Sequence, residues 1–530
     1  MSNHNRLLLV QSYNTEIPFT HMYTGLEQYR EILIKENPNF KKWAPKKDFE
    51  IKPIWPERLT LSLYRYGVNV SGSFIAANID TPTTVMNGMC NPKRLIKELR
   101  KAENKGNPYT HVGFTIFIDS YSEFIKNAQA VKKYNKNIIT IAGNVGSLFE
   151  KTINFVDYVC NGDGVTFFRK LFGERINQNY RLELKPSKLM IDVFGIRFKS
   201  KMVYLTTKLG CPYKCDFCGT YQLFKGKCTP PFFKPQEIYD AIIQYRKEIK
   251  KDFLLFIAEP TAIISSKWWY ELFDLFKGEE GDFPIYALTN TKSLLDFDFD
   301  RISDSSLRFQ GFNLGIESLN RNYNKNTSYE GYKNLIKKLS DYGIATYVTY
   351  MIGFDYHTHK KVWDDMYKLV NLDAAVFSIL NLKPIPGTHI WNNLKKEGRL
   401  LNVPYDLYYF QGFQSFTHPH FKPGFEDMLP LLCKIHTYFE KETGSLVTSY
   451  IKLYETLNEL YPEKNFGKSL KRYKDISKAL FPSWKKHLNP TNEQIEYYLS
   501  HINDINKIPL YIRLIKNSSL FKKIYQRIYN

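Results

Sequence analysis

The chain has 530 residues, of which 43% are apolar, 24% are charged and 16% are aromatic. At the usual domain size this length corresponds to about three domains, which excludes a single small binding module. The aromatic content also excludes a disordered chain, because disordered sequences are poor in aromatic residues. Lysine and arginine exceed aspartate and glutamate by 74 to 53, and the net charge of +21 should attract nucleic acid, phosphorylated metabolites or an acidic membrane surface.

Neither a membrane span nor a secretory signal is evident in the sequence. No apolar run approaches the roughly 18 to 20 residues that a spanning helix needs, and the apolar stretch at 7–10 is too short for a signal peptide. We therefore expect a cytoplasmic protein. Its 7 cysteines are too few for a disulfide framework, but three of them fall between positions 211 and 218. In the cytosol such a cluster indicates metal or redox chemistry.

Strand-like and helix-like segments follow one another in the first 185 residues. Apolar, β-rich segments at 6–10, 68–77, 111–118 and 137–142 predict strands. The segments at 90–102 and 122–134 have apolar residues at three- and four-residue spacing, which predicts helices. This alternation predicts a parallel, doubly wound, Rossmann-like α/β domain over residues 1–185.

Ligands of such sheets bind beyond the carboxyl ends of the strands. Small residues are frequent at these predicted ends, where they let a ligand approach the backbone. The candidate binding residues are Gln11, Ser12, Ser120, Gly143, Asn144, Gly162 and Gly164. Ordinary βα turns would explain the same residues equally well.

A lysine-rich stretch at 181–201 reads as a linker, and the alternation then resumes. Six β-rich segments predict a partial (β/α)6 barrel over residues 186–400. They lie at 202–207, 253–258, 285–290, 311–317, 346–354 and 374–382. From 401 to 530 the pattern becomes mainly helical, which predicts a third, helical domain.

The segment LTTKLGCPYKCDFCGTYQ places Cys211, Cys215 and Cys218 directly after the first of these strands. Three thiolates in one short loop can hold three irons of a [4Fe–4S] cluster and leave the fourth iron open to a small molecule. Alternatively, Cys228 could complete a four-cysteine zinc site. Three merely buried cysteines are a third explanation.

This C-x3-C-x2-C loop, with the aromatic Phe217 before its last cysteine, resembles that of radical S-adenosylmethionine (radical SAM) enzymes. GFNLGIES, with Gly315 and Glu317, looks like the family's fourth-strand motif, and the resemblance implies that Glu317 lies near S-adenosylmethionine. KPIPGT at 383–388 resembles the sixth-strand segment. After the second strand the chain has Ala-Glu-Pro in place of a paired-acid turn, so Glu259 is expected to reach the amino group of S-adenosylmethionine without help from a backbone N–H of the proline.

The domain order, with a GDG turn at 162–164, resembles radical SAM enzymes that carry an N-terminal cobalamin-binding domain. The resemblance implies a [4Fe–4S] cluster, S-adenosylmethionine and cobalamin as cofactors. The D-x-H-x-x-G motif that supplies a histidine to cobalt in other corrinoid proteins is absent, so we expect cobalamin to bind without a protein histidine. A cobalamin-like scaffold that has lost the cofactor is the competing interpretation.

By this resemblance, the enzyme makes a 5′-deoxyadenosyl radical and modifies an unactivated carbon of a natural product, peptide or lipid. Cobalamin-dependent methyl transfer is the leading reaction, and cobalamin-independent cyclisation or rearrangement is the alternative. An electron donor such as flavodoxin or ferredoxin is the expected partner. A zinc-stabilised protein that binds anions or nucleic acid is the alternative from another class, although no RNA-binding domain of the RNA methylthiotransferases is evident and nucleic acid is not the expected partner.

Several further residues allow either a functional or a packing role. His357 and His359 follow the fifth barrel strand, and His418 and His420 flank Pro419. Turn packing explains these histidines at least as well as a role in the pocket. The remaining cysteines, for which packing is expected, are Cys90, Cys160, Cys228 and Cys433. The tail at 505–530 interleaves basic and apolar residues without an acid, which is typical of a helix lying on an anionic membrane and suggests peripheral membrane contact.

Overall fold

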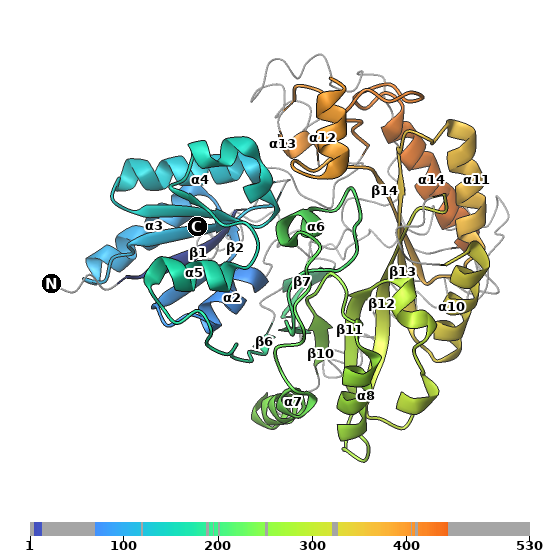
Figure 1. The fold of residues 1–530 in the computed structure, drawn as a ribbon, viewed down its shortest axis with the longest axis horizontal. Coiled ribbons are helices and arrows are strands. Elements are labelled where there is room, and N and C mark those ends of the chain that lie inside the picture. The colour runs from blue at the N-terminus through green and yellow to red at the C-terminus, as the bar shows by residue number, and fades with distance from the viewer. Residues whose placement is uncertain are drawn as a thin grey trace, which may run out of the picture.

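The structure is a computed structural model that describes most of the chain between residues 5 and 443. The described ranges are 5–12, 69–117, 120–186, 190–193, 196–199, 202–249, 253–320, 327–403, 405–408 and 412–443. They form two α/β units side by side, one N-terminal and one central, and Figure 1 shows the segment after the central sheet at the top of the view. The basic tail at 505–530 and the side chain of Cys433 lie outside the described part.

The N-terminal unit contains a five-stranded parallel sheet in the order β2-β1-β3-β4-β5. Its strands are β1 (Leu7–Ser12), β2 (Thr83–Cys90), β3 (His111–Thr115), β4 (Ile139–Gly143) and β5 (Tyr158–Val159). This is the flavodoxin-like order, in which the strand order reverses between β1 and β3, and ligands of such sheets bind at that point of the carboxyl edge. The predicted doubly wound sheet is confirmed.

Helices cover both faces of this sheet (Figure 1). They are α2 (Val70–Ala77), α3 (Pro92–Asn104), α4 (Tyr121–Tyr134) and α5 (Gly164–Phe172). Helices α3 and α4 pack together on one face, and α2 and α5 pack together on the other. Two short 3-10 helices, η3 (Val145–Leu148) and η4 (Glu150–Asn154), follow β4.

The strand predicted at 68–77 is wrong, because the structure has helix α2 there. The side chain of Asn69 accepts a hydrogen bond from Gly72 N at 2.9 Å and caps the helix. An apolar run this short has no periodicity that separates a strand from a buried helix. Strand β2 was not predicted because Thr83–Cys90 combines threonine, asparagine and glycine with few β-branched apolar residues.

The stretch read as a linker contains strands as well. Residues Lys185–Pro186 form β6, which pairs antiparallel with the first barrel strand. Residues Met190–Val193 (β7) and Ile196–Lys199 (β8) form an antiparallel hairpin. The chain therefore enters the central unit through paired strands.

The central unit is a seven-stranded sheet in the order β14-β13-β12-β11-β10-β9-β6, of which all strands but β6 run parallel. The parallel strands are β9 (Met202–Leu205), β10 (Leu254–Ile257), β11 (Phe283–Thr289), β12 (Leu307–Glu317), β13 (Ala345–Ile352) and β14 (Val376–Asn381). Within the described residues the outer strands β14 and β6 do not pair with each other, so the barrel is open. The predicted partial (β/α)6 barrel is confirmed.

Helices lie outside the barrel, and their apolar faces explain the burial pattern along the strands. They are α7 (Pro235–Ile249), α8 (Ser266–Leu275), α9 (Thr291–Leu295), α10 (Tyr329–Asp341) and α11 (His359–Val370). On β12 the outward side chains of Phe312, Leu314 and Ile316 are fully buried. The alternate residues Gly315 and Glu317 are only partly buried and point to the barrel interior.

The segment after β14 packs against both units. Helix α14 (Met428–Thr443) packs on β14 and α11, and Leu432 and Phe439 belong to the barrel core. Helix α13 (Tyr405–Tyr408) packs against α4, with the ring centroids of Tyr405 and Tyr121 5.0 Å apart. No described helix is long and apolar enough to span a bilayer.

Candidate functional site

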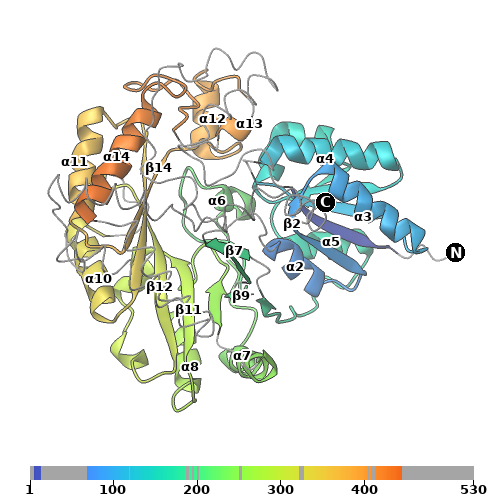
Figure 2. The same ribbon diagram turned by 180° about the vertical axis from the view of Figure 1, so that it is seen from behind.

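The three clustered cysteines lie in the loop that follows β9 and precedes α6 (Gly219–Phe224). Cys211, Cys215 and Cys218 are partly exposed and form no disulfide. Cys218 is the N-cap of α6, and its backbone N–H donates to Cys215 O at 3.1 Å. Figure 2 shows, in agreement with Figure 1, that α6 lies between the N-terminal unit and the barrel. The loop therefore faces the junction of the two units.

The stem of this loop is held by the segment that follows α6. Gly210 has φ +83°, and a Cβ atom there would lie 2.1 Å from Lys227 O. Leu209 N donates to Thr229 Oγ1 and Thr229 N donates to Leu209 O, both at 2.9 Å. A side chain at position 210 would push these segments apart, so glycine is required there.

The arrangement of the cysteines bears on the choice between zinc and an iron–sulfur cluster. Within the described residues, no three His, Cys, Asp or Glu side chains meet where they could hold one metal ion. Cys228 Sγ faces the carbonyl oxygens of Thr229 at 3.5 Å and Gly210 at 3.7 Å, and burial raises the pKa of its thiol. These contacts favour the three-cysteine interpretation.

Phe217 packs into a small apolar cluster at the carboxyl ends of β13 and β14. Its ring lies 6.4 Å from that of Phe354, centroid to centroid. Leu382, Leu394 and Phe416 are buried members of the same cluster. Next to it in the chain, Asp216 O accepts a hydrogen bond from Ile390 N at 3.1 Å, in the first turn of α12 (His389–Lys396). The segment after β14 therefore contacts the cysteine loop.

Glu259 is buried and engaged by the residues that lead into the cysteine loop. One carboxylate oxygen accepts hydrogen bonds from Thr207 N at 2.5 Å and Thr207 Oγ1 at 2.6 Å. The other forms a short ion pair with Lys208 Nζ, and both side chains are 4% exposed or less. Lys208 Nζ also donates to Ala262 O at 2.6 Å. Glu259, which follows β10, is therefore held by the residues that follow β9.

Gly315 and Glu317 lie at the carboxyl end of β12 and face the barrel interior. Glu317 has φ +66°, a left-handed conformation that is uncommon outside glycine. The next residue, Ser318, is fixed by a contact of 2.6 Å between its Oγ and Tyr356 OH. Strained backbone of this kind is frequent at ligand sites.

The predicted edge of the N-terminal sheet divides into two groups. Gly143, Asn144, Gly162 and Gly164 line one cavity. Ser120 does not line it, because its side chain is buried and its Oγ donates to Phe117 O at 3.1 Å as α4 begins. Gln11 and Ser12 end β1 and are also outside the lining, and the side chain of Ser12 is not described.

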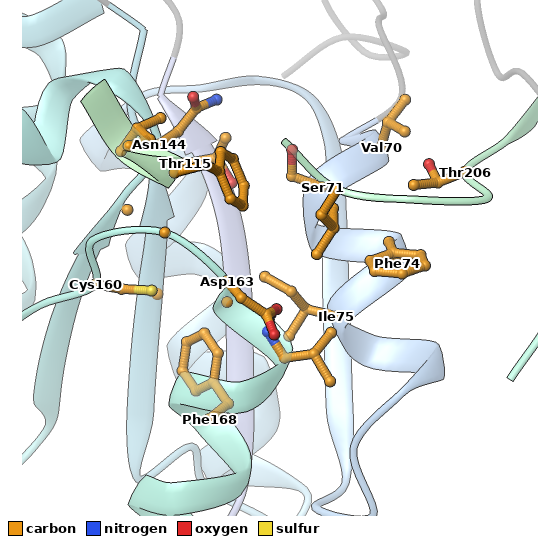
Figure 3. A pocket seen from close by; sticks show the side chains of 18 of the residues that line it. Val70, Ser71, Phe74, Ile75, Thr115, Asn144, Cys160, Asp163, Phe168 and Thr206 are labelled. Carbon is orange, nitrogen blue, oxygen red and sulfur yellow. Dashed lines mark hydrogen bonds between the residues drawn. The ribbon is translucent and has the colours of Figure 1, made fainter. Parts of the chain in front are cut away.

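The cavity has a volume of about 220 Å³ and lies between the two units. It extends from the carboxyl edge of the sheet, at Thr115 and Asn144, down to Phe168 of α5 (Figure 3). Figure 3 also shows Phe74 and Ile75 of α2 beside it and Thr206 from the barrel unit. Further lining residues from the barrel unit are Lys208, Leu209, Gly210, Thr220, Leu223, Phe224, Ala258 and Pro260.

Sequence reasoning missed much of this lining. The α2 residues were missed because their segment was read as a strand, and Lys208 because nothing in the pattern predicts its burial. Cys160, for which packing was predicted, is buried and lines the cavity, and burial raises the pKa of its thiol to about 12. Its position at the carboxyl end of the β5 segment was the available signal.

Two of the histidines singled out in the sequence, His357 and His418, hold turns. His418 is 7% exposed, and its Nδ1 accepts hydrogen bonds from His420 N and Phe421 N at 3.0 and 3.2 Å. Burial lowers the pKa of His418 to about 4. His357 is fully buried beside Asp365 of α11, 3.5 Å from its carboxylate. None of them lines the cavity.

Comparison with known proteins identifies the central unit. Residues 206–369 match the Radical SAM superfamily. The chain contains a radical SAM domain. The match runs from the end of β9 through α11 and includes the three cysteines, Glu259 and Glu317. None of the curated proteins matches the chain.

Two solved structures share the whole architecture. The radical S-adenosylmethionine methyltransferase TsrM from Kitasatospora setae, solved with cobalamin and a [4Fe–4S] cluster bound, is 12% identical, with a TM-score of 0.51 over 82% of this chain and 88% of that one. The cobalamin-dependent S-adenosylmethionine radical enzyme OxsB, with aqua-cobalamin and S-adenosylmethionine bound, is 11% identical, with a TM-score of 0.53 over 97% and 81%. At this identity the likeness concerns the fold alone, in which an N-terminal parallel sheet precedes a partial barrel.

Proposed function

We propose that this radical SAM protein is a cobalamin-dependent methyltransferase that acts on an unactivated carbon of a natural product, peptide or lipid. The observation that carries the proposal is the cavity shared by the carboxyl edge of the N-terminal sheet and the stem of the cysteine loop. A ligand at this edge would lie directly beside a cofactor held by the cysteines. In the proposed assignment, the domain at 1–185 binds cobalamin and the domain at 186–400 carries the radical SAM site. The domain at 401–530 completes this site from the C-terminal side.

The cysteine loop and the barrel interior fit a cluster and S-adenosylmethionine. Cys211, Cys215 and Cys218 would hold three irons, and Phe217, Gly315 and Glu317 would border S-adenosylmethionine from the loop and from β12. When bound, these groups supply a 5′-deoxyadenosyl radical for hydrogen abstraction, and cobalamin adds methyl transfer. The chain orients the substrate and keeps water out of the barrel. Glu259 accepts a hydrogen bond from Thr207 and forms an ion pair with Lys208. To contact the amino group of S-adenosylmethionine, as proposed, it would have to give up one of these interactions.

The cavity fits part of a corrinoid. Gly143 has room, since a Cβ atom there would meet no atom closer than 3.9 Å. Cavity volumes of roughly 300–1,000 Å³ are usual for whole ligands, so a cavity of about 220 Å³ would receive one arm of cobalamin while the corrin ring lies at its mouth.

The test is anaerobic reconstitution with and without hydroxocobalamin, with two reciprocal variants. Gly143→Leu, which fills the cavity, should lose the corrinoid and keep the cluster, whereas Cys211→Ala should do the reverse. With substrate, methyl transfer should yield S-adenosylhomocysteine as well as 5′-deoxyadenosine. Wild-type protein that binds no corrinoid and yields 5′-deoxyadenosine alone would contradict methyl transfer and favour cyclisation or rearrangement. Mass spectrometry of extracted metabolites would then name the substrate.

An acidic electron donor such as a flavodoxin or ferredoxin would reduce the cluster. Three exposed lysines lie beside the cysteine loop: Lys214 within it, and Lys225 and Lys227 after α6. Within the described part of the chain none of them forms an ion pair. This excess of positive charge near the cluster loop supports docking of an acidic protein.

Peripheral membrane contact through the tail at 505–530 stays a prediction, because the tail lies outside the described residues. Its cations, each worth about 1 kcal/mol near an anionic bilayer, would favour a lipid substrate. Co-sedimentation of the full chain and of a truncation ending at Asn506 with anionic and neutral vesicles tests this. Equal binding by the two proteins would contradict it.

A further inference from the structure

The main chain of Phe354, just past the end of β13, is held from two sides by buried histidines. Phe354 N donates to His357 Nδ1 at 3.2 Å, and Phe354 O is 2.9 Å from His418 Nε2. His357 comes from the same turn, whereas His418 is 64 residues away in the sequence. The second contact therefore joins the C-terminal segment to the barrel.

Hydrogen bonds to its other nitrogen fix the tautomer of His418. Nδ1 accepts from His420 N and Phe421 N, so it carries no proton. A neutral ring then has its proton on Nε2, which donates to Phe354 O. The two nitrogens thus have separate tasks, because Nδ1 shapes the local turn and Nε2 reaches the barrel.

The segment that carries His418, Gln414–Phe421, is here called the strap. Next to its start, Gly412 N donates to Asn381 Oδ1 at 2.9 Å, and Asn381 Nδ2 donates to Phe413 O at 3.0 Å. Asn381 is the last residue of β14, so the strap is anchored to β14 at one end and to the β13 turn through His418 at the other. Gln414, Ser415 and Phe416 are almost fully buried.

Phe354 connects the strap to the cysteine loop. Its ring faces Phe217 at 6.4 Å, and Phe416 of the strap belongs to the same apolar cluster. Phe217 lies directly before Cys218. The path from His418 Nε2 to the loop therefore consists of one hydrogen bond, one aromatic side chain and one ring contact.

We propose that His418 is a positioning residue, which holds Phe354 against Phe217 and so sets the place of the cysteine loop over the barrel. The inference rests on the proposed function, because it assumes that this loop holds a cluster. The strap then helps to position the cysteine loop, so the C-terminal segment does more than cover β14.

The two tasks of His418 can be separated by substitution in the full-length protein. In His418→Asn the amide oxygen stands near the position of Nδ1 and can accept the two turn hydrogen bonds, but the side chain is too short to reach Phe354 O. In His418→Gln the amide nitrogen can reach Phe354 O, but the turn acceptor is lost. His420→Asn is the matched control, because His420 is two residues away in the same strap and is exposed.

We expect His418→Asn to bind normal amounts of iron but to change the EPR spectrum of the reduced cluster with S-adenosylmethionine and to raise KM for S-adenosylmethionine several-fold. Hydrogen exchange of residues 211–218 in the cluster-free protein should also become faster. His418→Gln should restore these properties towards wild type, even if its melting temperature falls. His420→Asn should match wild type throughout.

Two results would overturn the inference. One is that His418→Asn matches His420→Asn in spectrum, KM and hydrogen exchange. The other result applies if the His418 variants do not fold. Phe354→Leu keeps the main-chain hydrogen bonds but removes the ring, and an unchanged EPR spectrum, KM and hydrogen exchange in this variant would also overturn the inference. A wild-type protein without a cluster would instead contradict the proposed function.

Discussion

Gly219 and Val145 approach each other so closely that a Cβ atom on Gly219 would lie 3.1 Å from Val145 Cγ1. Gly219 directly follows Cys218, and Val145 follows Asn144 at the carboxyl edge of the N-terminal sheet. Nearby, a Cβ atom on Gly162 would lie 3.2 Å from Leu223 O of α6. The cysteine loop and the ligand edge of the N-terminal sheet are therefore in direct contact, which suits a reaction that needs two cofactors side by side.

Gly219→Val should separate these surfaces. Overpacking in a tight contact costs about 1–3 kcal/mol, so we expect the free energy of unfolding in urea to fall by that order. Val145→Ala should restore part of the loss in the double variant, because it removes the methyl groups that clash. If Gly219→Val and the double variant had equal free energies of unfolding, the clash with Val145 would not be the cause of the lost stability.

Replacing Cys211, Cys215 or Cys218 by alanine should remove the cluster and abolish cleavage of S-adenosylmethionine. Cys228→Ala should keep both, since Cys228 Sγ faces backbone carbonyls. Iron content and 5′-deoxyadenosine formation measure the two properties. If Cys228→Ala lost its metal as completely as the others, the four-cysteine zinc interpretation would replace the cluster.

The elements that the sequence predicted well are those with a clear apolar pattern. The segment at 111–118, which contains the fully buried strand β3 (His111–Thr115), has five apolar residues in eight, and such a run at the centre of a sheet is recognisable by itself. Helix α2 was mistaken for a strand because eight residues of α2 complete barely two turns, too few for a helical period to emerge. Spacing within one loop was enough to identify the cysteine triad.

Pairings between distant segments could not be predicted. Lys208 and Glu259 are 51 residues apart, and no local pattern indicates that the lysine is buried or that it occupies the carboxylate. The same holds for His418 and Phe354. Such contacts depend on which strand ends meet at the edge of the sheet, and this follows from the three-dimensional fold.

Glu259→Gln should destabilise the protein by about 3–5 kcal/mol, the usual effect of leaving one charge of a buried pair without its partner. Lys208→Met with Glu259→Gln should be closer to wild type, because no unpaired charge remains. As a control, Glu426→Gln removes an exposed ion pair with Lys422, which solvent screens and whose loss should change the stability little. Urea unfolding measures the change. An unaltered stability with a raised KM for S-adenosylmethionine would instead assign Glu259 to the ligand.

Folding stability should depend on pH through His418. Burial lowers the pKa of His418 from 6.5 to about 4 in the folded protein, so the unfolded chain takes up the proton first as the pH falls. The contribution is complete above pH 6.5 and declines towards pH 4, by about 3 kcal/mol in all. His418→Asn should flatten this part of the stability profile. An identical profile in the variant would assign the acid sensitivity to other groups.

Charge reversal beside the cysteine loop tests how electrons reach the cluster. Lys214→Glu, Lys225→Glu and Lys227→Glu in combination should slow turnover supported by a reduced flavodoxin at least tenfold, since like charges disfavour docking. Turnover supported by dithionite, a small reductant, should change little because it needs no docking surface.

The matched control reverses three exposed lysines at the C-terminal ends of α3 and α4, namely Lys105, Lys133 and Lys136. This control changes the net charge equally but lies in the N-terminal unit, away from the loop. Added salt should slow the flavodoxin reaction of wild type and speed that of the loop variant, because screening weakens the attraction in the first and the repulsion in the second. Equal slowing by both triple variants would mean that net charge alone guides the donor, whereas slowing with dithionite as well would mean that the substitutions disturb the cluster loop itself.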